Sequence, residues 1–135
     1  MLALRILFEN DRLLAVDKPA GFHSHPPEDK SVRLNHSKDC LSILQKQTGL
    51  KLFQAHRLDR ATSGVLLFSK AREWNSALQT QFQERLVGKT YFCLVRGELI
   101  GGIRLESEID GQPSLTEAEG IFSFALPIPH PRGGD

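Results

Sequence analysis

The residues best suited to chemistry lie together in one short stretch, 56–64, which reads His-Arg-Leu-Asp-Arg-Ala-Thr-Ser-Gly. Its aspartate, Asp59, is flanked by Arg57 and Arg60. A carboxylate held among guanidinium groups is ionised at neutral pH and can act as a nucleophile, while the arginines can bind phosphate. An isolated Arg-x-Asp-Arg cluster is more often a surface ion pair, so the neighbouring residues must decide between these interpretations.

Apolar segments on both sides of Asp59 are expected to form strands that hold it in a loop. Residues 53–58 precede the aspartate and residues 65–69 follow it, and each segment is apolar enough to be buried. The Thr-Ser-Gly turn signal at 62–64 is expected to shape the loop, since glycine permits close approach of the backbone. The sequence therefore predicts a strand–loop–strand unit with Asp59 in its loop.

Two helices and five further strands are expected around this unit. The shorter helix, 40–47, has Asp39 as its N-cap and ends before Gly49. The longer helix, 72–86, is expected to stop at Gly88. Its apolar face comprises Trp74, Ala77, Leu78, Phe82 and Leu86. The further strands are predicted at 6–9, 13–17, 90–96, 103–109 and 115–124, with turns at Asn10-Asp11 and at Gly111-Gln112-Pro113.

This pattern of many strands with two inserted helices indicates an α+β fold with a mixed, mainly antiparallel sheet. The 135 residues fit one domain, which we expect to span 1–126. Residues 127–135 are expected to form an irregular tail, because they contain three prolines and two glycines, which break regular structure. Residues 18–38, which are also rich in proline, are expected to form a loop.

Composition indicates a soluble globular protein of the cytoplasm. The chain is 40% apolar and 24% charged, and it contains neither an apolar run of about 20 residues nor a signal-peptide pattern, so no membrane partner is expected. Cys40 and Cys93 lack metal-type spacing and are expected to be reduced thiols in or near the core. A monomer is the expected oligomeric state.

Positive charge is concentrated around Asp59 although the whole chain carries a net charge of only +1. Residues 30–90 contain eleven Lys and Arg against four Asp and Glu, which gives +7. The remainder contains six against twelve, which gives −6. A basic region around the candidate carboxylate would suit a polyanionic partner, although a basic segment is more often simply a solvated face of the protein.

The motif and the apolar strand after it closely resemble the active-site motif of the RluA family of RNA pseudouridine synthases. Two further segments resemble this family and occur in its order. Residues 13–21 are similar to its hydrophobic strand followed by Lys-Pro-x-Gly, which leads to a His-Pro pair at His25-Pro26. Residues 88–91, Gly-Lys-Thr-Tyr, are similar to its Lys-x-Tyr motif. The resemblance covers residues 5–97.

The resemblance implies the pseudouridine synthase catalytic-type fold, with Asp59 at the floor of a central cleft. It implies that Asp59 is the catalytic carboxylate, and that Tyr91 stacks on the target base and is a candidate for removing the C5 proton. Arg57 would contact RNA where the uridine leaves the stack, and Arg60 would contact phosphate. The substrate would be a uridine in structured transfer or ribosomal RNA. The isomerisation includes no redox or phosphoryl step, so no cofactor is expected.

One family motif is not found in the sequence. A later strand of the Gly-Arg-Thr-His-Gln-Ile-Arg type would follow a strand such as 115–118, but the chain instead becomes rich in proline. We therefore expect a catalytic domain that is truncated on its C-terminal side. An alternative is a non-catalytic RNA-binding relative or an inactive fragment. No metal is expected, because the histidines of residues 23–36 and Cys40 fit no standard zinc spacing.

Overall fold

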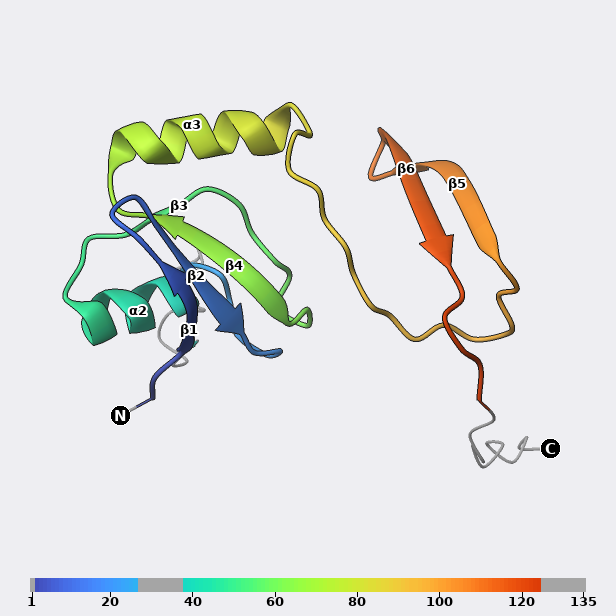
Figure 1. Ribbon diagram of the computed structural model, residues 1–135, viewed down its shortest axis with the longest axis horizontal. Helices are drawn as coiled ribbons and strands as arrows, with labels where there is room; N and C mark the ends of the chain where they lie inside the picture. Colours follow the sequence, from blue (N-terminus) through green and yellow to red (C-terminus); the bar gives the residue numbers. More distant parts are fainter. Residues whose placement is uncertain (1, 27–37, 125–135) are drawn as a thin grey trace. The chain divides into compact units, whose positions relative to one another are not determined.

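The computed structural model describes residues 2–26 and 38–124, which form two compact units, Met1–Lys89 and Thr90–Asp135 (Figure 1). Among these described residues, the first unit contains a four-stranded sheet and two helices, and the second contains a two-stranded sheet. The strands of each sheet pair in antiparallel fashion, so the predicted α+β class is confirmed. The predicted tail, 127–135, lies outside the described residues, as do residues 27–37 of the loop predicted at 18–38.

The four-stranded sheet of the first unit has the order β1-β2-β4-β3. Strand β4 therefore lies between β2 and β3, and the loop that contains Asp59 joins the two neighbours β3 and β4. The predicted strand before this loop is much shorter than expected, because the chain leaves the ladder after its second residue. The strands are β1 (Arg5–Glu9), β2 (Leu13–Lys18), β3 (Phe53–Gln54) and β4 (Gly64–Ser69).

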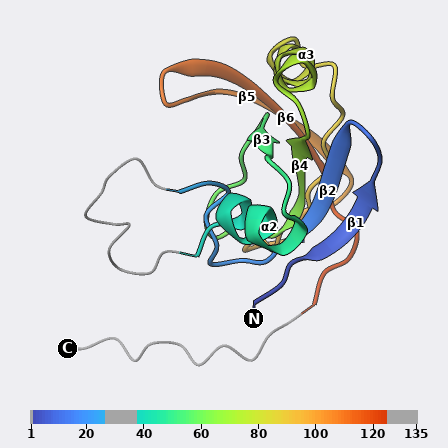
Figure 2. The ribbon, with the colours of Figure 1, turned by 90° about the vertical axis from the view of Figure 1, so that its left-hand side faces the viewer.

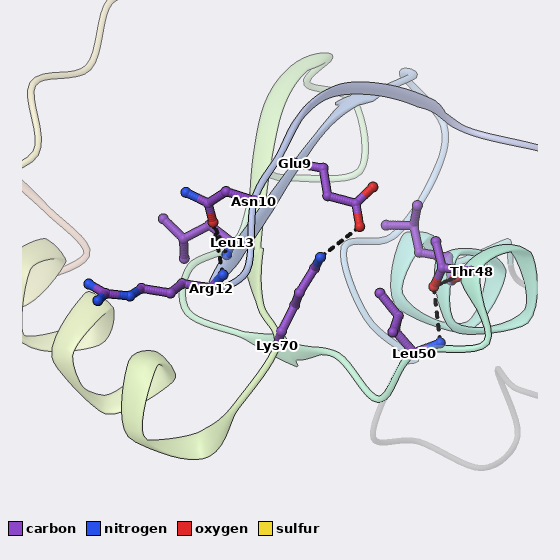
Figure 3. Close-up of polar contacts among 8 residues, drawn as sticks. Glu9, Asn10, Arg12, Leu13, Thr48, Leu50 and Lys70 are labelled. Atoms are coloured by element: carbon purple, nitrogen blue, oxygen red, sulfur yellow. Dashed lines mark hydrogen bonds and ion pairs between the residues drawn. The ribbon is translucent and has the colours of Figure 1, made fainter.

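The hairpin between β1 and β2 forms as predicted from its Asn-Asp turn. The side-chain oxygen of Asn10 accepts hydrogen bonds from the backbone N–H groups of Arg12 (2.9 Å) and Leu13 (2.8 Å), which closes the turn (Figure 3). Such local side-chain bonds are the reason asparagine favours turns. An ion pair of 2.6 Å between Lys70 and Glu9 joins the end of β1 to the residue that follows β4.

Helix α2 (Cys40–Thr48) begins and ends close to where the sequence predicts. The Asp39 carboxylate accepts a hydrogen bond of 2.7 Å from the backbone N–H of Ser42, which satisfies one of the free donors at the N-terminus. Gly49 ends the helix in the left-handed conformation, with φ of 72°. The predicted caps are therefore confirmed.

The core of the first unit lies between α2 and one face of the sheet (Figure 2). Burial raises the pKa of the Cys40 thiol to about 11, so this cysteine is a neutral core residue, as expected. Leu58, one residue before Asp59, also belongs to the core and anchors the loop. The other buried members are Leu4, Leu14, Val16, Leu44, Leu52, Leu66 and Phe68.

Helix α3 (Arg72–Gln83) is shorter than predicted, and the apolar face expected of it is largely uncovered within the first unit. The helix ends before Gly88 because Arg85 adopts a left-handed conformation, with φ of 59°. Of the five predicted face residues only Leu78 is buried, and the Trp74 ring instead lies beneath the Arg12 guanidinium at 4.2 Å.

The second unit contains a hairpin of β5 (Gly102–Ile109) and β6 (Gln112–Glu119), which confirms the two strands predicted there. The turn is Asp110-Gly111, one residue earlier than predicted, and both residues have positive φ, 53° and 73°. Asp-Gly with two positive φ values matches the right-handed twist of paired strands, which explains why the turn forms at this dipeptide. Strand β6 ends earlier than the predicted 115–124.

The strand predicted at 90–96 is wrong. These residues form no regular structure, and Cys93, expected near the core, is exposed. The segment is rich in β-branched and aromatic residues, but that preference depends on packing and on a paired neighbour. Within the described part of the second unit, the segment has no strand beside it.

Within residues 2–26 and 38–124, no helix is long and apolar enough to cross a bilayer.

Candidate active site

The segment that carries Asp59 alternates between exposed and buried side chains. Arg57 and Asp59 are exposed, whereas Leu58 between them is buried in the core. Alternate residues of an extended chain point to opposite sides, so anchoring Leu58 inward turns its two charged neighbours outward. The backbone N–H of Thr62 then donates to the carbonyl of Asp59 (3.0 Å), which closes a tight turn after the aspartate.

Ser24 holds the backbone of Leu58 by two buried hydrogen bonds. Its hydroxyl donates to the Leu58 carbonyl (2.8 Å) and accepts from the Leu58 N–H (3.0 Å). The hydroxyl therefore does what a paired strand would do for this residue, and it satisfies two backbone groups that would be costly to leave unpaired. The contact fixes the residue directly before Asp59.

Lys18 holds the other side of the same loop. Its side chain is fully buried at the end of β2, and its ammonium donates to the carbonyls of Thr62 (2.6 Å), Pro19 (3.2 Å) and Arg60 (3.4 Å). Three carbonyls match the three donors of an ammonium group. The loop is thus fixed from both directions, by Ser24 before the aspartate and by Lys18 after it.

The charge of Lys18 also acts on the site. Burial lowers the pKa of Lys18, whereas the negative charge of Asp59 acts in the opposite direction. The Lys18 ammonium and the Asp59 carboxylate therefore attract each other. A lysine that the sequence presents only as part of a Lys-Pro-x-Gly segment thereby supplies positive charge beneath the candidate carboxylate.

Arg60 and Arg57 differ in whether their side chains form hydrogen bonds with the protein. The Nε of Arg60 donates to the Gly21 carbonyl (3.1 Å), and the Gly21 N–H donates to the Arg60 carbonyl (2.7 Å). Gly21 has φ of 87°, a conformation that favours glycine. Arg57 is exposed and makes no side-chain hydrogen bond or ion pair among the described residues, so its guanidinium is available to a ligand.

Of the predicted site residues, Asp59, Arg57 and Arg60 lie on one loop of the first unit, where all three are exposed on its surface. Tyr91 belongs to the second unit and is 60% exposed there. Sequence reasoning missed the supporting roles of Lys18 and Ser24, whose contacts join residues far apart in the sequence. In the part of the chain that the structure describes, no cluster of three or more His, Cys, Asp or Glu side chains could hold a metal ion.

Removing the Ser24 hydroxyl is expected to destabilise the first unit. In Ser24→Ala, the buried N–H and carbonyl of Leu58 lose their partner, which costs about 1–3 kcal/mol. Ser76→Ala is the matched control, since its hydroxyl donates to the Arg72 carbonyl on an exposed helix surface. Urea denaturation followed by circular dichroism measures both changes. Equal stabilities of the two variants would contradict the role assigned to Ser24.

Comparison with known proteins places this site in a family. The family model described as RNA pseudouridylate synthase matches residues 12–125. The tRNA pseudouridine synthase C of Haemophilus influenzae is 34% identical over 147 aligned residues, which cover 93% of this chain and 58% of that protein. The human pseudouridylate synthase RPUSD2 is 40% identical over 96 residues, which cover 70% of this chain and 17% of that protein.

A solved structure, that of human RNA pseudouridylate synthase domain containing 4, aligns with 83% of this chain and 47% of its own at 17% identity and a TM-score of 0.47. The chain spans about half the length of the tRNA pseudouridine synthase C proteins that it matches. The family model nevertheless covers the Asp59 loop, the segments that hold it and most of the second unit. The chain therefore belongs to the RNA pseudouridylate synthase family.

Proposed function

We propose that this chain carries the catalytic aspartate of an enzyme that isomerises uridine to pseudouridine in structured RNA, with Asp59 as the reacting carboxylate. One observation carries the proposal: an exposed carboxylate is presented between two exposed arginines by a loop that buried contacts hold on both sides. A solvent-facing charge held this firmly suits attack on a substrate, because fixed geometry lowers the entropy cost of reaction. Membership of the family supports the same assignment.

The reaction requires a uridine to be detached and rejoined. The N1–C1′ glycosidic bond breaks, the uracil turns, and C5 bonds to C1′; C5 loses its proton and N1 gains one. Atoms and electrons balance without a redox partner, and we propose that no cofactor takes part. Asp59 would either attack C6 or C1′, or assist a glycal path. A carboxylate can form the covalent intermediate in the first two cases.

Arg57 and Arg60 are proposed to bind the RNA. A uridine inside a stem must leave its stack to be reached, which costs a few kcal/mol, so contacts must hold the opened strand. The exposed guanidinium of Arg57, which makes no hydrogen bond among the described residues, suits a contact with the opened strand. The terminal nitrogens of Arg60 suit a phosphate. Transfer RNA or a short stem-loop is the proposed substrate, in keeping with the names of the bacterial relatives.

Tyr91 is proposed to stack on the target base and to remove the C5 proton. A tyrosine combines a flat ring with a polar hydroxyl, which both roles need. The residue is exposed and free of regular structure in the second unit, so its side chain can serve a ligand. We propose a monomeric enzyme that works in the cytoplasm, where Cys40 and Cys93 would remain reduced.

Release of tritium tests the proposal. The protein is incubated with unmodified transfer RNA transcripts that carry uridine tritiated at C5, and in a second arm with ribosomal RNA fragments. Formation of pseudouridine is expected to release tritium to water in step with the new nucleoside, which is measured separately by digestion and mass spectrometry. A salt titration of RNA binding on the same samples reports phosphate contacts by its slope.

The outcomes distinguish the proposed enzyme from a relative that only binds RNA. Tritium release with pseudouridine formation supports the enzyme. Salt-dependent RNA binding by a folded protein, without release from either kind of RNA, would contradict the proposal and favour a non-catalytic RNA-binding relative. If the folded protein shows neither RNA binding nor tritium release, both functions are contradicted for these residues.

A further inference from the structure

His56 completes the sheet next to the catalytic loop with its side chain. The backbone ladder between β3 and β4 stops at the pair Gln54–Phe68. The next N–H along β4, that of Leu67, donates instead to the Nε2 of His56 at 3.0 Å. A ring nitrogen that accepts a hydrogen bond carries no proton, so the geometry assigns a neutral imidazole whose proton is on Nδ1.

The ring is held on its flat side as well. The His56 ring stacks on the Phe82 ring of α3, with centroids 4.3 Å apart and an angle of 20° between the planes. The Gln54 side chain donates to the His56 carbonyl at 2.9 Å, which fixes the backbone of the same residue. One residue thus contacts β3, β4 and α3 immediately before Arg57 and the rest of the loop.

The surroundings of the ring favour its neutral form. Burial lowers the pKa of His56, and the ammonium of Lys89 lowers it further. The groups that β3, β4 and α3 present to the ring do not titrate: they are the Gln54 amide, the Leu67 N–H and the Phe82 ring. Among the described residues, Lys89 is the charged group that acts on His56.

We infer that His56 is a positioning residue for Asp59, and that its neutral imidazole fixes the start of the catalytic loop to β4 and α3. The inference rests on the proposed role of Asp59. Protonation of His56 would place a second donor against the Leu67 N–H and break the contact. Its lowered pKa means that the unfolded chain binds the proton first, so stability falls as the pH drops below about 6.5.

Two substitutions separate the acceptor from the stacking ring. His56→Gln keeps a hydrogen-bond acceptor about as far from the backbone as Nε2 and removes the titratable group. His56→Phe keeps a ring that can stack on Phe82 and removes the acceptor. Turnover of His56→Phe is expected to fall about 10- to 100-fold with little change in KM, because the aspartate is misplaced while the RNA contacts remain. Turnover of the parent is expected to fall as the pH drops below about 6.5, because the lowered pKa of His56 delays protonation of its ring to more acidic pH. His56→Gln, normalised to its own alkaline rate, is expected to lack that decline.

Nitrogen NMR of the imidazole tests the inference without any turnover. Two-bond proton–nitrogen spectra of the parent are expected to show Nδ1 protonated and Nε2 unprotonated near neutral pH, and the Leu67 amide shift is expected to titrate with the ring. For the turnover experiment, His23→Gln is the control, because it removes another histidine and should leave the acidic decline of turnover in place.

A protonated Nε2 at neutral pH, parental turnover in His56→Phe, or an unchanged acidic decline in His56→Gln would each overturn the inference. If the parent shows no turnover at all, the proposed function fails instead, and the NMR result still decides whether His56 fixes the loop. If His56→Phe does not fold, the pH profiles of the parent and His56→Gln decide the matter.

Discussion

Replacing Asp59 with asparagine is expected to abolish tritium release while leaving the protein folded and able to bind RNA. Asparagine has the size of aspartate but cannot act as an anionic nucleophile, so the rate should fall at least about 10³-fold. Stability should change by less than about 0.5 kcal/mol, because the exposed Asp59 carboxylate accepts no hydrogen bond among the described residues. The salt dependence of RNA binding should persist, since Arg57 and Arg60 are retained.

Asp17→Asn is the matched control for this substitution. Asp17 is an exposed carboxylate on β2, paired in register with Val65 of β4, and it is not part of the loop. Loss of the same charge there should leave tritium release at the parental rate. The proposed role of Asp59 is wrong if Asp59→Asn releases tritium as fast as Asp17→Asn, whatever the two variants do to RNA binding.

The sequence predicts the parts of the fold whose causes are local. Asp39 and Gly49 cap α2 through contacts within four residues, and Asn10 closes the first hairpin through bonds to its near neighbours. The strand expected at 90–96 is wrong because strand formation depends on a partner, which local composition cannot supply. Arg85 ends α3 by a conformation that few residues other than glycine adopt, and the sequence carries no signal of it.

The same distinction between local and long-range contacts applies to the candidate site. The clustering of Asp59 with Arg57 and Arg60 follows from their adjacency in the sequence. The contacts that hold their loop join residues 34 to 44 positions apart, from Ser24 to Leu58 and from Lys18 to Thr62, so no local pattern reveals them. A weaker signal was present: a lysine directly after an apolar strand must find acceptors if the fold buries it.

Lys18→Met is expected to have the second largest effect, because it removes the donors on which the loop depends. Methionine fills a similar volume but leaves the carbonyls of Thr62, Arg60 and Pro19 without the ammonium. Hydrogen bonds to a charged group contribute about 1.5–3 kcal/mol, and displacing the loop by about 1 Å can cost about 10²-fold in rate. Denaturation curves and tritium release measure the two losses.

Lys70→Met separates this effect from the loss of a lysine in general. Lys70 follows the other end of β4 and pairs with Glu9 in a contact that is partly open to solvent, so its removal should cost about 0–1 kcal/mol and spare turnover. Lys18→Met should lose turnover even at temperatures where it is fully folded, since the ammonium holds the loop that presents Asp59. Parental turnover in folded Lys18→Met would show that the loop keeps its geometry without the lysine, and that the contacts from Ser24 and His56 suffice to position the aspartate.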